Sequence, residues 1–256
     1  MLRTIREVFA FFFFLGRRSR KMKVFFLLSL LPVALAVLVR IAFAGRSSDV
    51  MPVFQEILMV YFLQFLIIIL TLFYGTSVCS EEIEGKTLPY LTTRPLTKGG
   101  IIIGKFAAYT ALSASMVLVS LAASYLIMSF EKLGEAATYG ALLRYAGVLL
   151  LGLMAYMALF TFLGTFLRKS ILVGLAFGFG WETAIQYFPG STQRFSVVHY
   201  LKSLLPYYSA GKFSILMFRL EPTSPAGAVL VLLLITAGFL GLACLFFSLK
   251  EYMFED

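Results

Sequence analysis

Charged, polar and apolar residues alternate in a short segment of the sequence, residues 80–98, which reads SEEIEGKTLPYLTTRPLTK. Ile83, Leu88 and Leu91 recur at near-helical spacing and give one apolar face. Pro95 ends this helix, because the residue before a proline avoids the α region. Such a segment can bury leucines in a groove of a partner protein and form ion pairs around them. It therefore predicts a docking helix, and the alternative is an ordinary interfacial loop.

A nucleotide-binding motif is present only in part. The stretch Gly99–Lys105 reads GGIIIGK and matches the first part of a P-loop, G-x-x-x-x-G-K. The next residue is Phe106, where a P-loop has the serine or threonine whose hydroxyl holds Mg²⁺. We interpret the match as accidental, and we expect that this chain does not hydrolyse a nucleotide by itself.

A protease motif is equally incomplete. The pair Glu81-Glu82 followed by Lys86, together with Phe195-x-x-x-His199, is similar to elements of intramembrane proteases of the prenyl-protein type. Those enzymes need a second histidine element, but His199 is the single histidine of this chain. We therefore predict no catalytic residue and no metal site. An intramembrane protease stays open as the alternative function, with a secondary transporter after it.

The composition excludes a water-soluble protein. Of 256 residues, 60% are apolar or aromatic and 14% are charged, whereas soluble domains have about 25% charged residues. A net charge of +9 would suggest nucleic acid in a soluble protein. Here the cations cluster at the ends of apolar runs, so they indicate membrane topology instead of nucleic-acid binding.

Six apolar stretches approach the roughly 20 residues that a membrane-spanning helix needs. They are continuous, so they favour helices over the alternating strands of a barrel. The sequence thus predicts an all-α integral membrane protein with six transmembrane helices and a single domain, residues 1–256. The predicted spans are Val24–Ala44, Val53–Cys79, Ile101–Phe130, Tyr139–Leu167, Ile171–Phe188 and Ala226–Leu249.

Lysines and arginines orient these spans. Seven cations between Arg3 and Lys23, together with Arg168 and Lys169, predict that both termini are cytoplasmic, in a cell (inner) membrane. Five phenylalanines in Val8–Leu15 predict a short N-terminal interfacial helix within residues 1–23. Residues 80–98 are then cytoplasmic, and residues 189–225 form an extracytoplasmic loop.

Polar residues inside the spans are functional candidates because burying them in lipid is costly. Glu182, beside Trp181, is the sharpest case, and Glu56 and Gln64 are weaker ones. Each either lines a transport path or forms a structural pair; for Glu182 the candidate partners are Arg194 and Lys202. The fifth span is short and glycine-rich, which suits a broken or re-entrant helix. Gly174 and Gly178 have the G-x-x-x-G spacing of close helix packing, within the chain or across a dimer.

Residues 80–98 and the region around Glu182 together resemble the permeases of type 2 exporter-class ABC transporters. In the family, the first segment is a coupling helix that seats on an ATPase. The matching positions in this segment are Glu81, Glu82, Gly85, Thr87, Leu88, Leu91 and Pro95, and Gly104 and Lys105 match just after it. The matching positions of the fifth span and its following loop are Trp181-Glu182, Pro189-Gly190, Ser196 and His199-Tyr200.

The resemblance implies a permease subunit and not an enzyme. It implies a second permease subunit, identical or different, two copies of a separate ATP-binding subunit, and contact with membrane lipid. ATP and Mg would bind the partner subunit, and this chain would hold no cofactor. Hydrolysis in the partner would then drive export of a substrate that no motif specifies.

Overall fold

The structure is a computed structural model, and it describes residues 2–43, 50–84, 97–132, 134–167, 169–188, 191–205 and 223–249 of the chain. Almost all of the residues in these ranges are helical, and the ranges contain no strand. The all-α class predicted from the continuous apolar runs is confirmed.

Within the described residues, five helical segments are long and apolar enough to cross a membrane. Two are built from more than one element: α2 (Arg20–Ser29) with α3 (Leu31–Ala42), and α4 (Met51–Ile57) with η1 (Leu58–Leu66) and α5 (Ile67–Glu84). The others are α7 (Lys98–Met128), α8 (Ala136–Phe166) and α12 (Pro225–Leu249). The predicted ends differ from these bounds by a few residues.

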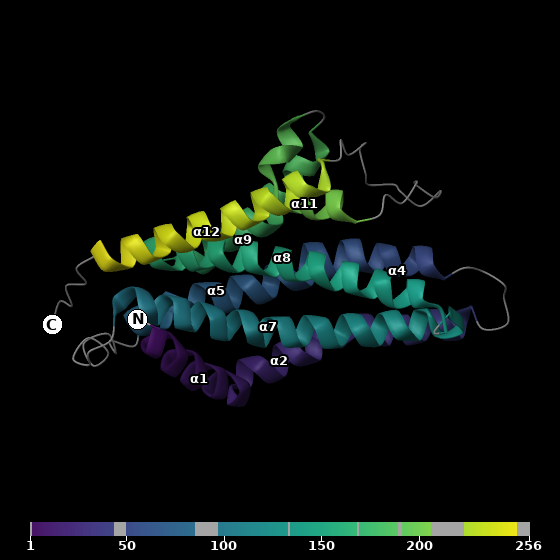
Figure 1. Ribbon diagram of the computed structural model, residues 1–256, viewed down its shortest axis with the longest axis horizontal. Coiled ribbons are helices and arrows are strands. Elements are labelled where there is room, and N and C mark those ends of the chain that lie inside the picture. Colours follow the sequence, from purple (N-terminus) through teal and green to yellow (C-terminus); the bar gives the residue numbers. More distant parts are fainter. Residues whose placement is uncertain are drawn as a thin grey trace.

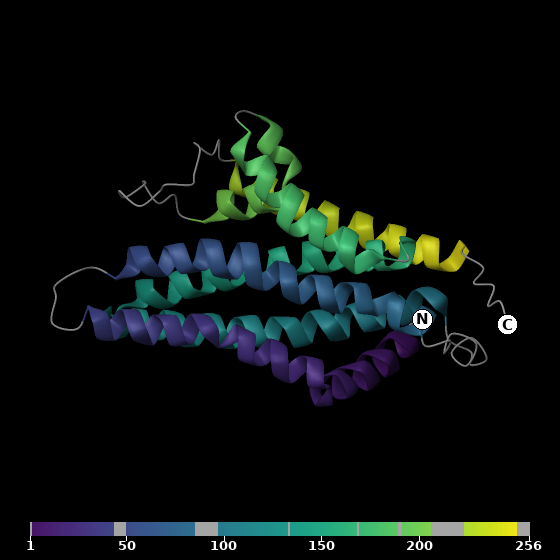
Figure 2. The same cartoon turned by 180° about the vertical axis from the view of Figure 1, so that it is seen from behind.

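The long helices run side by side along the long axis of the molecule (Figures 1 and 2). Within each span we compare the apolar stretch of 18 residues. Half or more of this stretch is buried in the second, third and fourth spans, against 22% in the first span and 17% in the last. The second, third and fourth spans therefore form the centre of the bundle. The first span and α12 lie on its flanks, where much of their surface faces the surroundings.

A sixth full span, predicted over Ile171–Phe188, is not confirmed. This stretch contains α9 (Ser170–Leu175), the π-helical η3 (Ala176–Trp181), α10 (Glu182–Ala184) and the 3₁₀ turn η4 (Ile185–Tyr187). Its apolar helix, Ser170–Ala184, is shorter than a span needs. The 3₁₀ turn η5 (Ser191–Phe195) and α11 (Val197–Leu204) follow, and they lie beside the start of α12 (Figure 1).

The first span is interrupted because Pro32, in the first turn of α3, has no N–H to donate to the carbonyl of Leu28. That carbonyl accepts a 2.7 Å hydrogen bond from the Tyr61 hydroxyl of the second span. The Ser120 hydroxyl of α7 donates to the carbonyl of Ser29 in the same way. Neighbouring helices thus supply the donors that the break removes.

The two ends of the bundle are held differently. At one end, Arg40 of α3 forms a 2.6 Å ion pair with Glu131 of η2 (Phe130–Lys132), in the turn between α7 and α8. The start of α1 (Leu2–Arg18), the end of α5 and the end of α12 lie at the opposite end (Figures 1 and 2).

Helices α5 and α8 approach each other most closely through two glycines. A Cβ atom on Gly164 would lie 2.8 Å from the carbonyl oxygen of Thr76 and 2.9 Å from its Cα. A Cβ on Gly75 would lie 2.9 Å from the Cβ of Phe160 and 3.1 Å from the carbonyl oxygen of Met157. Small residues of this kind let two backbones touch in a membrane, where close packing replaces the hydrophobic effect.

We expect Gly164→Ala to destabilise the protein by about 1–3 kcal/mol, because the new methyl group meets backbone atoms that cannot turn aside. Gly147→Ala is the matched control on the same helix, since nothing lies within 4 Å of a Cβ there. Removing that glycine should stabilise α8 by about 0.5–1 kcal/mol. Thermal unfolding of both variants in mild detergent measures the difference. Equal midpoints would contradict the close contact.

Candidate functional site

Glu182 is a buried carboxylate, only 1% exposed, at the start of α10. Its Oε2 accepts a 2.5 Å hydrogen bond from the hydroxyl of Ser196, and its Oε1 accepts a 3.0 Å bond from the backbone N–H of Val197. A longer bond, 3.4 Å, comes from the N–H of Val198. The carboxylate therefore caps the start of α11, where unpaired N–H groups and the positive end of the helix dipole favour an anion.

Gln186 connects this cap to two other elements. Its side-chain oxygen accepts a 2.5 Å hydrogen bond from the Lys202 ammonium of α11 and a 3.2 Å bond from the Gln64 amide of η1. Its side-chain nitrogen donates to the carbonyl of Glu182 at 2.5 Å. We call these five residues, Glu182, Gln186, Ser196, Lys202 and Gln64, the polar network.

The charges of the polar network do not form the direct ion pair that the sequence offered as one interpretation. The structure describes no ion pair between Glu182 and Lys202 or Arg194, and Arg194 is exposed. Burial lowers the pKa of Lys202 to about 8, and the negative charge of Glu182 acts in the opposite direction. The carboxylate is satisfied by hydroxyl and backbone donors, and the ammonium by an amide oxygen.

The structure brings together two of the three polar candidates that the sequence singled out in the spans. Gln64 and Glu182 are both in the polar network, although they are far apart in the chain. Glu56 lies on α4 with its side chain exposed, and it has no part in the network. Gln186 was missed. A glutamine at the end of an apolar run is uncharged, so it does not stand out as a costly residue in a span.

The glycines of the predicted G-x-x-x-G pair lie against the centre of the bundle. A Cβ on Gly174 would come within 2.4 Å of Leu72 of α5 and 3.2 Å of Phe160 of α8. A Cβ on Gly178 would come within 2.5 Å of Ile68. Both glycines therefore let α9 and η3 pack closely on α5 and α8 within one chain.

The residues of the incomplete protease motif are not assembled into a site. His199 lies on α11, where its Nε2 is 3.1 Å from the Thr223 hydroxyl. Glu81 and Glu82 lie in the last turn of α5, at another part of the bundle (Figure 1). Among the described residues, no group of three histidine, cysteine, aspartate or glutamate side chains is placed to hold a metal ion.

The predicted docking segment, residues 80–98, begins in the last turns of α5. Its first acidic residues continue α5 up to Glu84, and α7 starts at Lys98. Gly85, Thr87, Leu88, Leu91 and Pro95 lie outside the described residues. The two helices that flank the segment reach the same end of the bundle as the start of α1 (Figures 1 and 2).

Lys105 is a buried cation beside this end; from the sequence it was named as part of the incomplete P-loop and as a position that matches the family, and it was given no structural role. It is 1% exposed, and its Nζ donates a 2.9 Å hydrogen bond to the Val78 carbonyl of α5. The same Nζ lies 4.4 Å from the centre of the Phe12 ring of α1, which is cation–π geometry. Lys105 thus joins α1, α5 and α7.

The incomplete P-loop stretch has a packing role in the structure. A Cβ on Gly100 would meet Thr4 of α1 at 3.2 Å, and a Cβ on Gly104 would meet Val8 at 2.8 Å. The spacing of these glycines, four residues apart on α7, was the signal that could have revealed this contact.

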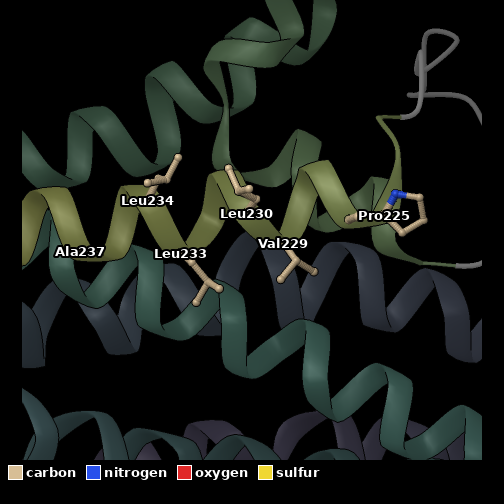
Figure 3. A pocket seen from close by; sticks show the side chains of 7 residues that line it. Pro225, Val229, Leu230, Leu233, Leu234 and Ala237 are labelled. Atoms are coloured by element: carbon tan, nitrogen blue, oxygen red, sulfur yellow. The ribbon is translucent and has the colours of Figure 1, made fainter.

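A groove of about 720 Å³ runs along the exposed face of α12 (Figure 3). Its lining is wholly apolar and comes from one helix. The residues are Pro225, Ala226, Val229, Leu230, Leu233, Leu234 and Ala237. No polar group is present there to orient a substrate, so the polar network is the better candidate site.

Five span-length helices and a polar network built between them define a multi-pass helical membrane protein. The chain matches the family described as ABC-2 family transporter protein over residues 16–181, from the end of α1 to the end of η3. This match covers more than half of the chain, and the chain belongs to that family of transporter permeases. The resemblance stated from residues 80–98 is confirmed. No curated protein matches the chain.

We expect Glu182→Gln to destabilise the protein by about 1–3 kcal/mol, because the amide turns a donor toward groups that are themselves donors. Glu56→Gln makes the same chemical change at an exposed position and should leave stability unchanged. Thermal unfolding in detergent compares the two variants. A Glu182→Gln protein as stable as the Glu56→Gln protein would show that the cap does not hold α11.

Proposed function

We propose that this chain is the permease subunit of an ATP-driven exporter. The family match over residues 16–181 carries the proposal, since ABC-2 permeases are the transport component of a larger machine. Two copies of a separate ATP-binding subunit would bind ATP and Mg, and two permease chains would form the path between them.

Residues 80–98 are the proposed docking site for the ATP-binding subunit. Support comes from the flanking helices, because α5 and α7 both reach one end of the bundle and hold the segment between them (Figure 1). Lys105 fixes the end of α5 to α7 and α1 through its contacts with Val78 and Phe12. A movement of the ATP-binding subunit against residues 80–98 would then move these helices as rigid bodies.

The proposed topology places this end in the cytoplasm of a cell with an inner membrane. Lys98 starts α7 and Lys169 precedes α9 at that end, and Arg17 and Arg18 follow on α1, which starts there, whereas the opposite end has the ion pair of Arg40 with Glu131. An excess of cations marks the cytoplasmic side. The stretch from Ser170 to Phe188 would enter the membrane from the cytoplasm as the sixth membrane element.

The polar network is proposed to hold the outer ends of the exit path. It joins η1, η4, α10 and α11 by hydrogen bonds of buried and half-buried side chains. The protease alternative is not favoured, because His199 and the Glu81–Glu82 pair lie on different parts of the bundle. No observation favours a secondary transporter.

We expect Glu81→Ala with Glu82→Ala to lower transport and substrate-stimulated ATP hydrolysis about tenfold or more, because the docking surface loses two charges that can be paired across the interface. Membrane insertion of the chain should be unchanged. The measurement is ATP hydrolysis and transport in vesicles that contain the chain and its ATP-binding subunit.

The matched control removes two exposed carboxylates from the opposite end of the bundle, Glu56→Ala with Glu135→Ala. That variant should keep its coupling to ATP hydrolysis. Transport by the purified chain in vesicles without ATP or a partner subunit would overturn the proposed function.

A further inference from the structure

A cluster of exposed cations lies where α1 and α2 meet. Arg17 and Arg18 end α1, and Arg20 and Lys23 lie in the first turn of α2, all with exposed side chains. We call Arg17, Arg18, Arg20 and Lys23 the basic joint. The two helices meet there at an angle, on the edge of the bundle (Figures 1 and 2).

No carboxylate neutralises the basic joint within the described part of the chain. The acidic residue of α1 is Glu7, and it is already paired with Arg3 at 2.9 Å. The first turn of α2 contains no acidic residue. The four positive charges are therefore left to the surroundings.

The helix dipole adds to this unbalanced charge. Ser19 caps α2, and its hydroxyl oxygen accepts a 3.2 Å bond from the N–H of Met22. The positive end of the dipole then lies beside Arg20 and Lys23, where cations are unfavourable and anions are favourable. A bound anion would stabilise both the cations and the helix start.

Exposed apolar side chains on both sides of the basic joint fix the depth of this anion site. Phe14 and Leu15 precede the joint, Val24 and Leu27 follow it, and each is more than half exposed. The first candidate span begins at Arg20. Apolar side chains in the acyl region with cations beside them place the joint at the level of the phospholipid headgroups.

The basic joint is held firmly by the bundle. A Cβ on Gly16 would come within 2.5 Å of Leu112 of α7, so α1 lies directly on that helix just before the joint. Further along α1, Val8 packs on Gly104, and Phe12 lies over Lys105. The cations are thus presented by a fixed scaffold.

We propose that the basic joint binds the phosphate groups of anionic phospholipids. The leaflet is the one on the side of the membrane where α1 starts and α5 ends. Charge complementarity and depth select a lipid headgroup as the occupant. The bound lipids hold α1 on α7, and through Phe12 and Lys105 they steady the end of α5 from which residues 80–98 begin. Lipid binding itself needs neither ATP nor the ATP-binding subunit, so it stands independently of the proposed function.

The test reconstitutes the full chain in phosphatidylcholine vesicles with a trace of spin-labelled phosphatidylglycerol or spin-labelled phosphatidylcholine. Electron paramagnetic resonance then measures the fraction of each lipid that the protein immobilises. We expect a clear preference for phosphatidylglycerol that falls at least about threefold in Arg17→Gln with Arg18→Gln, because each surface cation strengthens anionic-lipid attraction severalfold.

The matched control removes two exposed arginines from other parts of the chain, Arg144→Gln with Arg194→Gln, and should keep the preference. Helical content and orientation in the vesicles are checked for both variants by circular dichroism and by protease accessibility. Equal immobilisation of the two lipids by the unaltered chain would overturn the proposal. It would also be overturned by an equal loss in the control, or by displacement of the labelled lipid by millimolar inorganic phosphate.

Discussion

The lack of hydrogen-bond partners in lipid is the constraint on which this structure depends. A backbone carbonyl or N–H that loses its helical partner in a bilayer must find another one inside the protein. At the break before Pro32, the hydroxyl groups of Tyr61 and Ser120 take over this role. At the start of α11, the carboxylate of Glu182 does so. At both interruptions, polar side chains of the bundle supply the partners that the helices lose.

Much of the fold could be predicted from the apolar runs, because length and hydropathy alone decide which stretches can span a bilayer. Five predicted spans correspond to long helices of the structure. The stretch from Ile171 to Phe188 differs, since its composition is that of a span but it contains a π-helical turn and its apolar helix ends at Ala184, neither of which hydropathy specifies. The extension of the first span back to Arg20 also goes beyond its apolar run, which begins at Val24.

The candidate site could be predicted only in part. Gln64 and Glu182 were found because polar groups in apolar runs are costly, but that argument applied equally to Glu56, which the fold leaves exposed. Only the three-dimensional arrangement joins Gln64 to Glu182, since the link passes through Gln186. The stretch that contains Lys105 was interpreted as an incomplete nucleotide-binding motif. The spacing of Gly100 and Gly104 in the same stretch would have predicted close helix packing. The residues of 80–98 were recognised as a family pattern, and that recognition led to the right family.

The close backbone contact between α5 and α8 makes these two helices one rigid unit. Thr76 packs against Gly164, and Phe160 packs against Gly75. Neither helix can slide along the other without losing both contacts. Because α8 is 31 residues long, this rigid unit is about 46 Å long. A displacement at the end of α5 would therefore be shared by α8. The stretch from Ser170 to Phe188 rests on the same pair, because its Gly174 packs against Phe160 of α8 and Leu72 of α5.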